Sequence, residues 1–446
     1  MFSPDPASAR IGPFWITPGW TRANAATVWA ASFLTIGLSA FMSFAQPYIL
    51  NEVLRVPQGD QGTLTGTLAA LQEIIVITLV SFVGIWSDRV SRRRVYYLGF
   101  LAMSLGYAVY PFATNIGELI LYRCVFAIGI AMAPLMLSAC MVDAIQEVTR
   151  GRWIGSNNVL QGLGVVVMAL LLAKSPAWYA SLGADPVSAG RFAYWTAAAV
   201  CVVAAVTMAV GLPRIIPGRP GADAEPMLRQ IVTAIGQARR NPRLAVAYGG
   251  AFIGRGDFTV VGVYFSLWIV QAGMDLGMSS ADALGKAGML FGIVQGAAML
   301  WAFFMGMIVD RLNRLTGLCL ALTLAGTGYL LMGQVEDPFG PNFIPIALLL
   351  GMGEVSVIVA GGALLGQEAP ATNRGPIVGF YNAVGGIGIL FATYVGGLAF
   401  DNIGRTAPFT VMGLLNAVLL VCALVVRTRS RLSVEPSITP ARQNSP

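Results

Sequence analysis

The feature that most constrains this chain is a series of apolar stretches, each about 20 residues long, separated by short polar segments. A helix needs about 20 predominantly apolar residues to cross the hydrocarbon core of a bilayer. The predicted spans are residues 26–48, 64–86, 93–113, 118–142, 154–173, 191–213, 245–271, 285–308, 315–333, 343–366, 376–400 and 405–427. The predicted fold class is therefore an all-α polytopic membrane protein with twelve transmembrane helices.

The composition excludes several classes of protein. The 446 residues are 56% hydrophobic and only 11% charged, whereas a soluble domain carries about 25% charged residues. Histidine is absent, which excludes Ser-His-Asp triads and histidine metal ligands, and the five cysteines all lie in apolar runs, so no disulfide framework is expected. We therefore expect no enzyme, no cofactor and no bound metal.

The basic residues indicate the topology. Positive charge is concentrated in the loops on one side of the predicted spans, and the positive-inside rule places that side in the cytoplasm. An even number of spans puts both termini on that side, so we expect a multi-pass inner (plasma) membrane protein with cytoplasmic termini. The net charge of +7 is thus explained by topology, and no nucleic-acid partner is expected.

The longest connection between spans divides the chain in two. It is rich in Pro, Gly and Arg, and residues 226–240 within it are expected to form an amphipathic helix on the cytoplasmic face. The predicted organisation is a cytoplasmic tail (1–25), a six-helix bundle (26–213), a cytoplasmic linker (214–244), a second six-helix bundle (245–427) and a cytoplasmic tail (428–446).

Two short patterns recur in equivalent places in the two halves. The first pattern consists of Gly84, Asp88, Arg89 and Arg92, and it returns as Gly306, Asp310, Arg311 and Arg314. The second consists of Arg150, Gly151, Gly155 and Asn158, and it returns as Arg374, Gly375, Gly379 and Asn382. An internal repeat of this kind predicts two pseudo-symmetric bundles with a binding site between them near the bilayer midplane.

The first pattern resembles the loop signature that major facilitator transporters carry between spans two and three, with a weaker copy between spans eight and nine. The family usually has Gly where this chain has Ser91 and Asn313. Arg123, Ala127 and Gly129 are similar to the family's span-four pattern, with Ala127 in place of a Gly. The run that ends in Gly-Pro in span five of drug/proton antiporters is missing, which argues against a typical multidrug antiporter.

The resemblance implies a cytoplasmic latch that stabilises the outward-facing state. Its expected members are Gly84, Asp88, Arg89 and Arg92, with Asp310, Arg311 and Arg314 as the pseudo-symmetric copy and Glu147 and Glu368 as partners. The alternative is that these basic residues only fix orientation. The resemblance also implies that spans one, four, seven and ten line the central cavity.

Charged residues inside spans are energetically unfavourable and are treated as functional candidates. Guanidinium groups suit carboxylates or phosphates, and a buried carboxylate can carry a coupling proton. The substrate-binding candidates are Arg255, Arg123, Gln46 and Asn382, and the proton-coupling candidates are Glu354, Glu73 and Asp257. The alternatives are structural salt bridges and interhelical hydrogen bonds.

Arg255 and Asp257 are two residues apart, so on a regular helix they point about 200° away from each other. Both can face the cavity only if Gly254 and Gly256 loosen the helix; otherwise one bonds a neighbouring helix.

We therefore predict a monomeric, proton-coupled symporter of a small organic solute, anionic or zwitterionic, with the lipid bilayer as its surroundings. One alternative is a proton-driven efflux pump for drugs or amphipathic metabolites. A membrane-embedded enzyme or a sensor is the third, and it has no catalytic constellation to support it.

Overall fold

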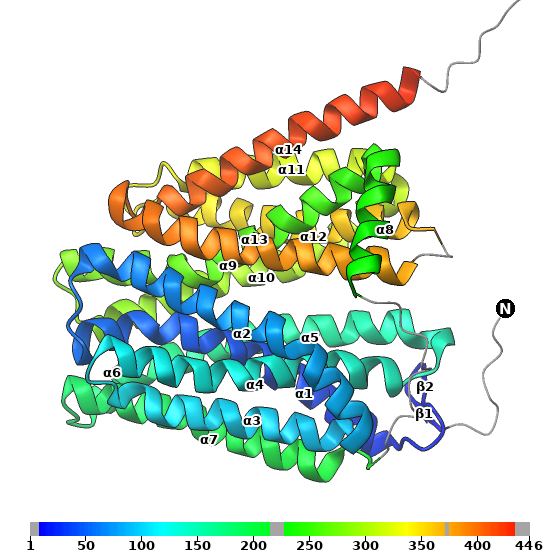
Figure 1. The fold of residues 1–446 in the computed structure, drawn as a ribbon. Helices are drawn as coiled ribbons and strands as arrows, with labels where there is room; N and C mark the ends of the chain where they lie inside the picture. The colour runs from blue at the N-terminus through cyan, green and yellow to red at the C-terminus, as the bar shows by residue number, and fades with distance from the viewer. Residues whose placement is uncertain (1–8, 215–226, 371–373, 433–446) are drawn as a thin grey trace, which may run out of the picture.

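The computed structural model describes residues 9–214, 227–370 and 374–432 (Figure 1). The outer parts of the two predicted tails and part of the predicted linker therefore lie outside the described residues. Within the described ranges, 12 helices are long and apolar enough to cross a membrane. They coincide with the twelve predicted spans, which are confirmed, and they extend several residues beyond most of them because polar first and last turns continue each helix.

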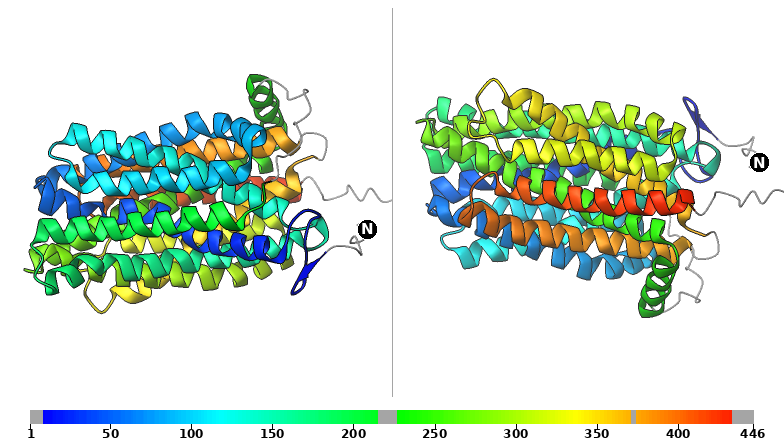
Figure 2. Two further views of the ribbon diagram at one scale, coloured as in Figure 1. Left: turned by 90° about the horizontal axis from the view of Figure 1, so that it is seen from below. Right: turned by 90° about the horizontal axis from the view of Figure 1, so that it is seen from above.

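The N-terminal bundle contains helices from the first half of the chain (Figures 1 and 2). Its elements are α1 (Arg22–Tyr48), a π-turn (Ile49–Val53), a 3₁₀ turn (Gln58–Asp60), α2 (Gln61–Val90), α3 (Arg92–Val109), a second 3₁₀ turn (Tyr110–Phe112), α4 (Ile116–Asp143), α5 (Glu147–Ala173), the short α6 (Ser175–Ser181) and α7 (Pro186–Gly211).

The C-terminal bundle contains helices from the second half. Its elements are α9 (Pro242–Asp275), α10 (Ser280–Arg311), α11 (Arg314–Met332), α12 (Phe343–Glu368), α13 (Arg374–Asn402) and α14 (Ala407–Leu432). The bundles meet where α2 packs against α13 and α5 packs against α10. These two pairs exchange under the internal repeat, as expected for two pseudo-symmetric halves.

Side-chain caps define several helix starts. Thr21 and Asn24 form a reciprocal capping box at α1, in which the Asn24 backbone N–H donates to Thr21 Oγ1 (3.2 Å) and the Thr21 N–H donates to Asn24 Oδ1 (2.9 Å). Asn115 caps α4 and Asn241 caps α9. Such caps satisfy amide groups that a helix leaves unpaired at its first turn.

A β-hairpin that was not predicted lies within the expected N-terminal tail. Strands β1 (Arg10–Ile11) and β2 (Phe14–Trp15) pair antiparallel, and the chain then bridges to Ile145 in the connection between α4 and α5. Trp15 N–H donates to Thr149 Oγ1 (3.1 Å). The hairpin therefore covers the end of the N-terminal bundle at which the chain begins.

The linker contains α8 (Met227–Arg240), close to the range predicted for the amphipathic helix. It packs against α9 and α13, across the end of the C-terminal bundle (Figure 1). We call the end of the molecule where α1 begins and α14 finishes the termini end, and the opposite end the far end.

Candidate functional site

Hydrogen bonds join the two bundles at the far end. Asp401, in the last turn of α13, accepts from the backbone N–H groups of Gly62 (2.8 Å) and Thr63 (2.6 Å) at the start of α2. A carboxylate at a helix N-terminus satisfies free N–H groups and interacts favourably with the helix dipole. This contact therefore fastens the C-terminal bundle to the N-terminal one.

Two further side chains, Gln271 and Arg405, donate hydrogen bonds at the far end. Gln271 Nε2 donates to Gln58 O and to Gln61 Oε1, both at 3.1 Å, and Arg405 donates to Gln58 Oε1 at 3.0 Å. The helices also approach closely, since a Cβ on Gly288 would lie 2.5 Å from Ala169 O. Polar contacts and close packing thus hold the far end shut.

A charged group meets an amide on the surface where α9 and α13 face α2. Arg255 of α9 is exposed and donates to Asn382 Oδ1 of α13 (3.0 Å). Glu73 of α2 interacts electrostatically with Arg255, and its Oε1 lies 3.7 Å from where a Cβ on Gly386 would be. Three of the predicted residues, from both bundles, are therefore neighbours here.

Asp257 points the other way from Arg255. Its side chain is fully buried inside the C-terminal bundle, where Asn416 Nδ2 donates to Oδ1 (3.1 Å) and Oδ2 (3.0 Å). The α9 helix is continuous through Gly254 and Gly256, so the two charges lie on opposite faces. Of the two arrangements considered above, the structure has the one in which Asp257 bonds a neighbouring helix.

Glu354 is also enclosed by the C-terminal bundle, with 1% of its surface exposed. Gln295 Nε2 of α10 donates to its Oε1 at 3.4 Å, while Oε2 has no hydrogen-bond partner. In this conformation neither Glu354 nor Asp257 lines a space between the bundles.

Arg123 lies inside the N-terminal bundle, 1% exposed. It donates to Ser43 Oγ (2.5 Å) and to Gln46 Oε1 (3.4 Å), and its guanidinium carbon lies 5.8 Å from the Phe126 ring centroid. Gln46 is held in turn by Thr65 and Tyr110. Among the described residues no carboxylate pairs with Arg123, so a buried cation is solvated by neutral groups alone.

Within the part of the chain that the structure describes, no ion pair joins the predicted latch residues across the two bundles. Arg92 forms an ion pair with Asp143 of α4, and Arg314 pairs with Asp310 (2.7 Å), each within one bundle. Among the described ion pairs none includes Asp88, Arg89, Arg311 or Glu147. Gly84 lies in α2 with open space where a Cβ would be.

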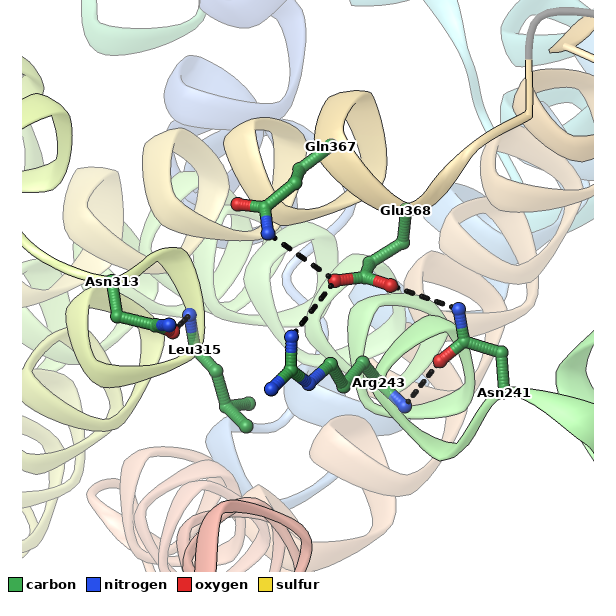
Figure 3. Close-up of polar contacts among 6 residues, drawn as sticks. All are labelled: Asn241, Arg243, Asn313, Leu315, Gln367 and Glu368. Carbon is green, nitrogen blue, oxygen red and sulfur yellow. Dashed lines mark hydrogen bonds and ion pairs between the residues drawn. The ribbon is translucent and has the colours of Figure 1, made fainter. Parts of the chain in front are cut away.

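Glu368 has partners other than the predicted latch. Asn241 Nδ2 donates to its Oε2 (2.8 Å), Arg243 pairs with its Oε1 (3.5 Å), and both partners lie at the start of α9 (Figure 3). Glu368 thus ties the end of α12 to the start of α9 within one bundle.

The two loop copies differ at the position where the family usually has Gly. Ser91 has φ +148°, in a region that favours glycine, and its buried Oγ has no hydrogen-bond partner. Asn313 has φ −58° and caps α11 by accepting from Leu315 N–H (3.0 Å) (Figure 3). Asn313 therefore does not adopt the left-handed backbone that glycine allows.

Sequence reasoning missed three acceptors or donors that organise these groups. Asp143 pairs with Arg92, Asp401 caps α2, and Asn416 binds Asp257. The first two had a visible signal, an acid at the end of an apolar span. Asn416 resembled any other polar residue within a span.

Comparisons with known proteins agree with this architecture. The chain is 26% identical over 394 residues to the magnetosome protein MamH of Paramagnetospirillum magneticum. The aligned region covers 85% of this chain and 86% of MamH. It is 27% identical over 410 residues to the magnetosome protein MamZ of the same organism. The chain spans only 61% of the length of that MamZ.

Solved transporters share the fold. The nucleoside transporter NupG superposes with a TM-score of 0.70 at 12% identity, covering 92% of this chain and 100% of NupG. A bacterial homolog of the human lysosomal transporter Spinster, in an inward-facing and unoccupied conformation, superposes with a TM-score of 0.59 at 14% identity, covering 93% and 98%. The family model of the Major Facilitator Superfamily matches residues 27–347 and 286–444. This chain belongs to the Major Facilitator Superfamily.

Proposed function

We propose that this protein is a secondary active transporter that moves a small organic solute, anionic or zwitterionic, across the inner membrane by alternating access, driven by protons. The observation that carries the proposal is the pairing of Arg255 with Asn382 on the surface that faces Glu73 of the other bundle. A guanidinium held by a neutral amide keeps donor capacity for a carboxylate or phosphate.

The proposed state is inward-facing, with both termini in the cytoplasm. The far end, closed by Asp401 and Gln271, is then the external side. In the opposite state the far-end contacts separate and solute reaches Arg123 and Gln46. Arg92 and the other latch residues of the N-terminal bundle then approach partners on the second bundle. We propose that Glu73, Glu354 and Asp257 exchange the coupling proton and that the protein works as a monomer.

The first experiment is a thermal-shift screen of the purified protein against carboxylates, phosphate esters and amino acids. The solute that stabilises the protein most is then tested for uptake into proteoliposomes under an inward proton gradient. Arg255→Gln should reduce uptake by about 100-fold, corresponding to the loss of one charge-assisted pair of about 3 kcal/mol. Arg191→Gln, an arginine at the far end, is the matched control and should retain uptake.

Two outcomes would contradict the proposal. If neither a protonophore nor the Glu354→Gln substitution changes uptake, transport is not coupled to protons. Stabilisation by amphipathic cations alone, with Arg255→Gln as active as the unmodified protein, would favour the efflux alternative.

A further inference from the structure

The C-terminal bundle encloses two carboxylates away from the surface that carries Arg255. Asp257 is 0% and Glu354 is 1% exposed. Among the described residues no basic side chain pairs with either, and Arg255 projects from the opposite face of α9. An ionised carboxylate buried in a dry interior is strongly unfavourable unless a positive charge compensates it.

The two carboxylates belong to one cluster. Asn416 of α14 binds Asp257 of α9, and its Cβ lies 3.5 Å from where a Cβ on Gly326 of α11 would be. The next residue back, Ala325, lies against Gly353 of α12, with 2.5 Å between the Ala325 Cα and a Cβ built on that glycine. Glu354 follows Gly353, so these helices bring both acids to the same part of α11.

Tyr329 of α11 completes the group. It is fully buried and interacts electrostatically with Asp257 and with Glu354. Asp257 in turn interacts electrostatically with Glu354. Gln295 of α10 and Asn416 are the neutral polar groups beside them.

Unpaired oxygens show what is missing. Glu354 Oε2, Asn416 Oδ1 and Tyr329 OH are all buried without a hydrogen-bond partner. Buried polar atoms are almost always paired, so each unpaired one needs an explanation. A single added proton satisfies one acceptor, whereas a metal cation satisfies several oxygens together. Oxygen donors of this kind suit hard cations, and Ca²⁺ requires six to eight of them.

We infer that Asp257, Glu354 and Asn416, with Tyr329, form a binding site for a monovalent cation of the size of Na⁺ inside the C-terminal bundle. The inference rests on the proposed transporter function and refines its coupling. Na⁺ competes at this site with the proton, and the solute binds elsewhere, near Arg255. The helix α9 carries a member of each site.

The test measures the melting temperature of the purified full chain in NaCl, KCl or choline chloride at constant ionic strength. Na⁺ should raise the melting temperature by several degrees over choline, because a ligand that binds only the folded state stabilises it. The increase in melting temperature should be smaller at pH 5.5 than at pH 8, because more protons compete with Na⁺ for the carboxylates at pH 5.5. Asp257→Asn and Glu354→Gln should abolish it. Glu336→Gln, which changes an exposed carboxylate of the same bundle, should preserve it.

Tyr329→Phe removes only the hydroxyl group, so it provides a second test of the site if the acid variants do not fold. It should shift the Na⁺ midpoint to higher concentration by about tenfold, the loss of one ligand worth about 1.4 kcal/mol. Calorimetric titration of the unmodified protein with NaCl should show one site.

Several results would overturn the inference. One is an equal change of the melting temperature in Na⁺ and choline, and another is a Na⁺ effect that persists in both acid variants. Stronger binding of Ca²⁺ or Mg²⁺ than of Na⁺ would also overturn it, as would stabilisation at low pH that Na⁺ does not increase. Solute uptake measured in choline buffer under a proton gradient tests the proposed transport function separately, so the two can fail independently.

Discussion

The two bundles share a repeat in sequence but bury charge of opposite sign. The N-terminal bundle encloses one cation, Arg123, solvated by Ser43, Gln46 and the Phe126 ring. The C-terminal bundle encloses two acids, Asp257 and Glu354, beside Asn416 and Gln295. The repeat therefore conserves helix arrangement and loop pattern, while each interior has been specialised separately. The predictions below test that difference.

The largest expected effect comes from reversing the sign inside the N-terminal bundle. Arg123→Glu should destabilise the protein by about 3 kcal/mol or more, because Gln46 Oε1 would face an unpaired buried carboxylate. Arg123→Met is the control and should keep the melting temperature close to normal, since an apolar replacement of a buried charge is often neutral. Equal stability of the two variants would mean that this interior accepts acids as the other one does.

The next largest effect concerns the hydrogen bonds between the two bundles at the far end. Asp401→Ala removes the acceptor of two N–H groups of α2, worth about 2 kcal/mol in total. The closed far end should lose population by roughly thirtyfold relative to the open state. Labelling of a cysteine introduced at Gln58 should accelerate accordingly. The control is Asp282→Ala, because the Asp282 carboxylate bonds Ser279 at the start of its own helix, and this variant should leave the labelling rate unchanged. A similar acceleration in both variants would show that Asp401 has no special role in closing the far end.

A smaller effect distinguishes the two loop copies. Ser91→Gly should stabilise the protein by about 1 kcal/mol, because φ +148° is unfavourable for a residue with a Cβ. Asn313→Gly should instead destabilise it by a few tenths of a kcal/mol, through loss of the α11 cap. Thermal denaturation of both variants gives the comparison, and the same sign of change in both would contradict it.

The smallest effect is a pH dependence at a helix start in the N-terminal bundle. Hydrogen bonds from the side chain and backbone of Ser188 lower the pKa of Asp185 below its ordinary value. Because the folded-state pKa is depressed, the cap stabilises α7 at neutral pH and is lost as the pH falls through that pKa. The protection of the first turn of α7 against hydrogen exchange, corrected for the pH dependence of intrinsic exchange, should therefore fall on acidification. The first turn of α1, which Thr21 and Asn24 cap without a carboxylate, should show no such change.

Much of the fold was predictable because bilayer thickness imposes a length and composition on each span. The twelve spans followed from that constraint, and the two bundles followed from the internal repeat. Helix geometry left two arrangements open for Arg255 and Asp257, and the continuous α9 decides between them. The choice of partners did not, because an acid at a span end can reach several helices, and only tertiary packing brings Asp401 to α2 and Asp143 to Arg92. The hairpin in residues 10–15 was missed because strands of two residues have no periodicity to detect.

The length and continuity of α9 have a mechanical consequence. This continuous helix of 34 residues carries the Arg255 guanidinium on one face and the Asp257 carboxylate on the opposite face. Any rigid rotation of this helix about its axis turns both residues through the same angle, so the two side chains move in opposite directions. We therefore expect a ligand bound beside Arg255 to change the position of Asp257 without a relay of intermediate side chains.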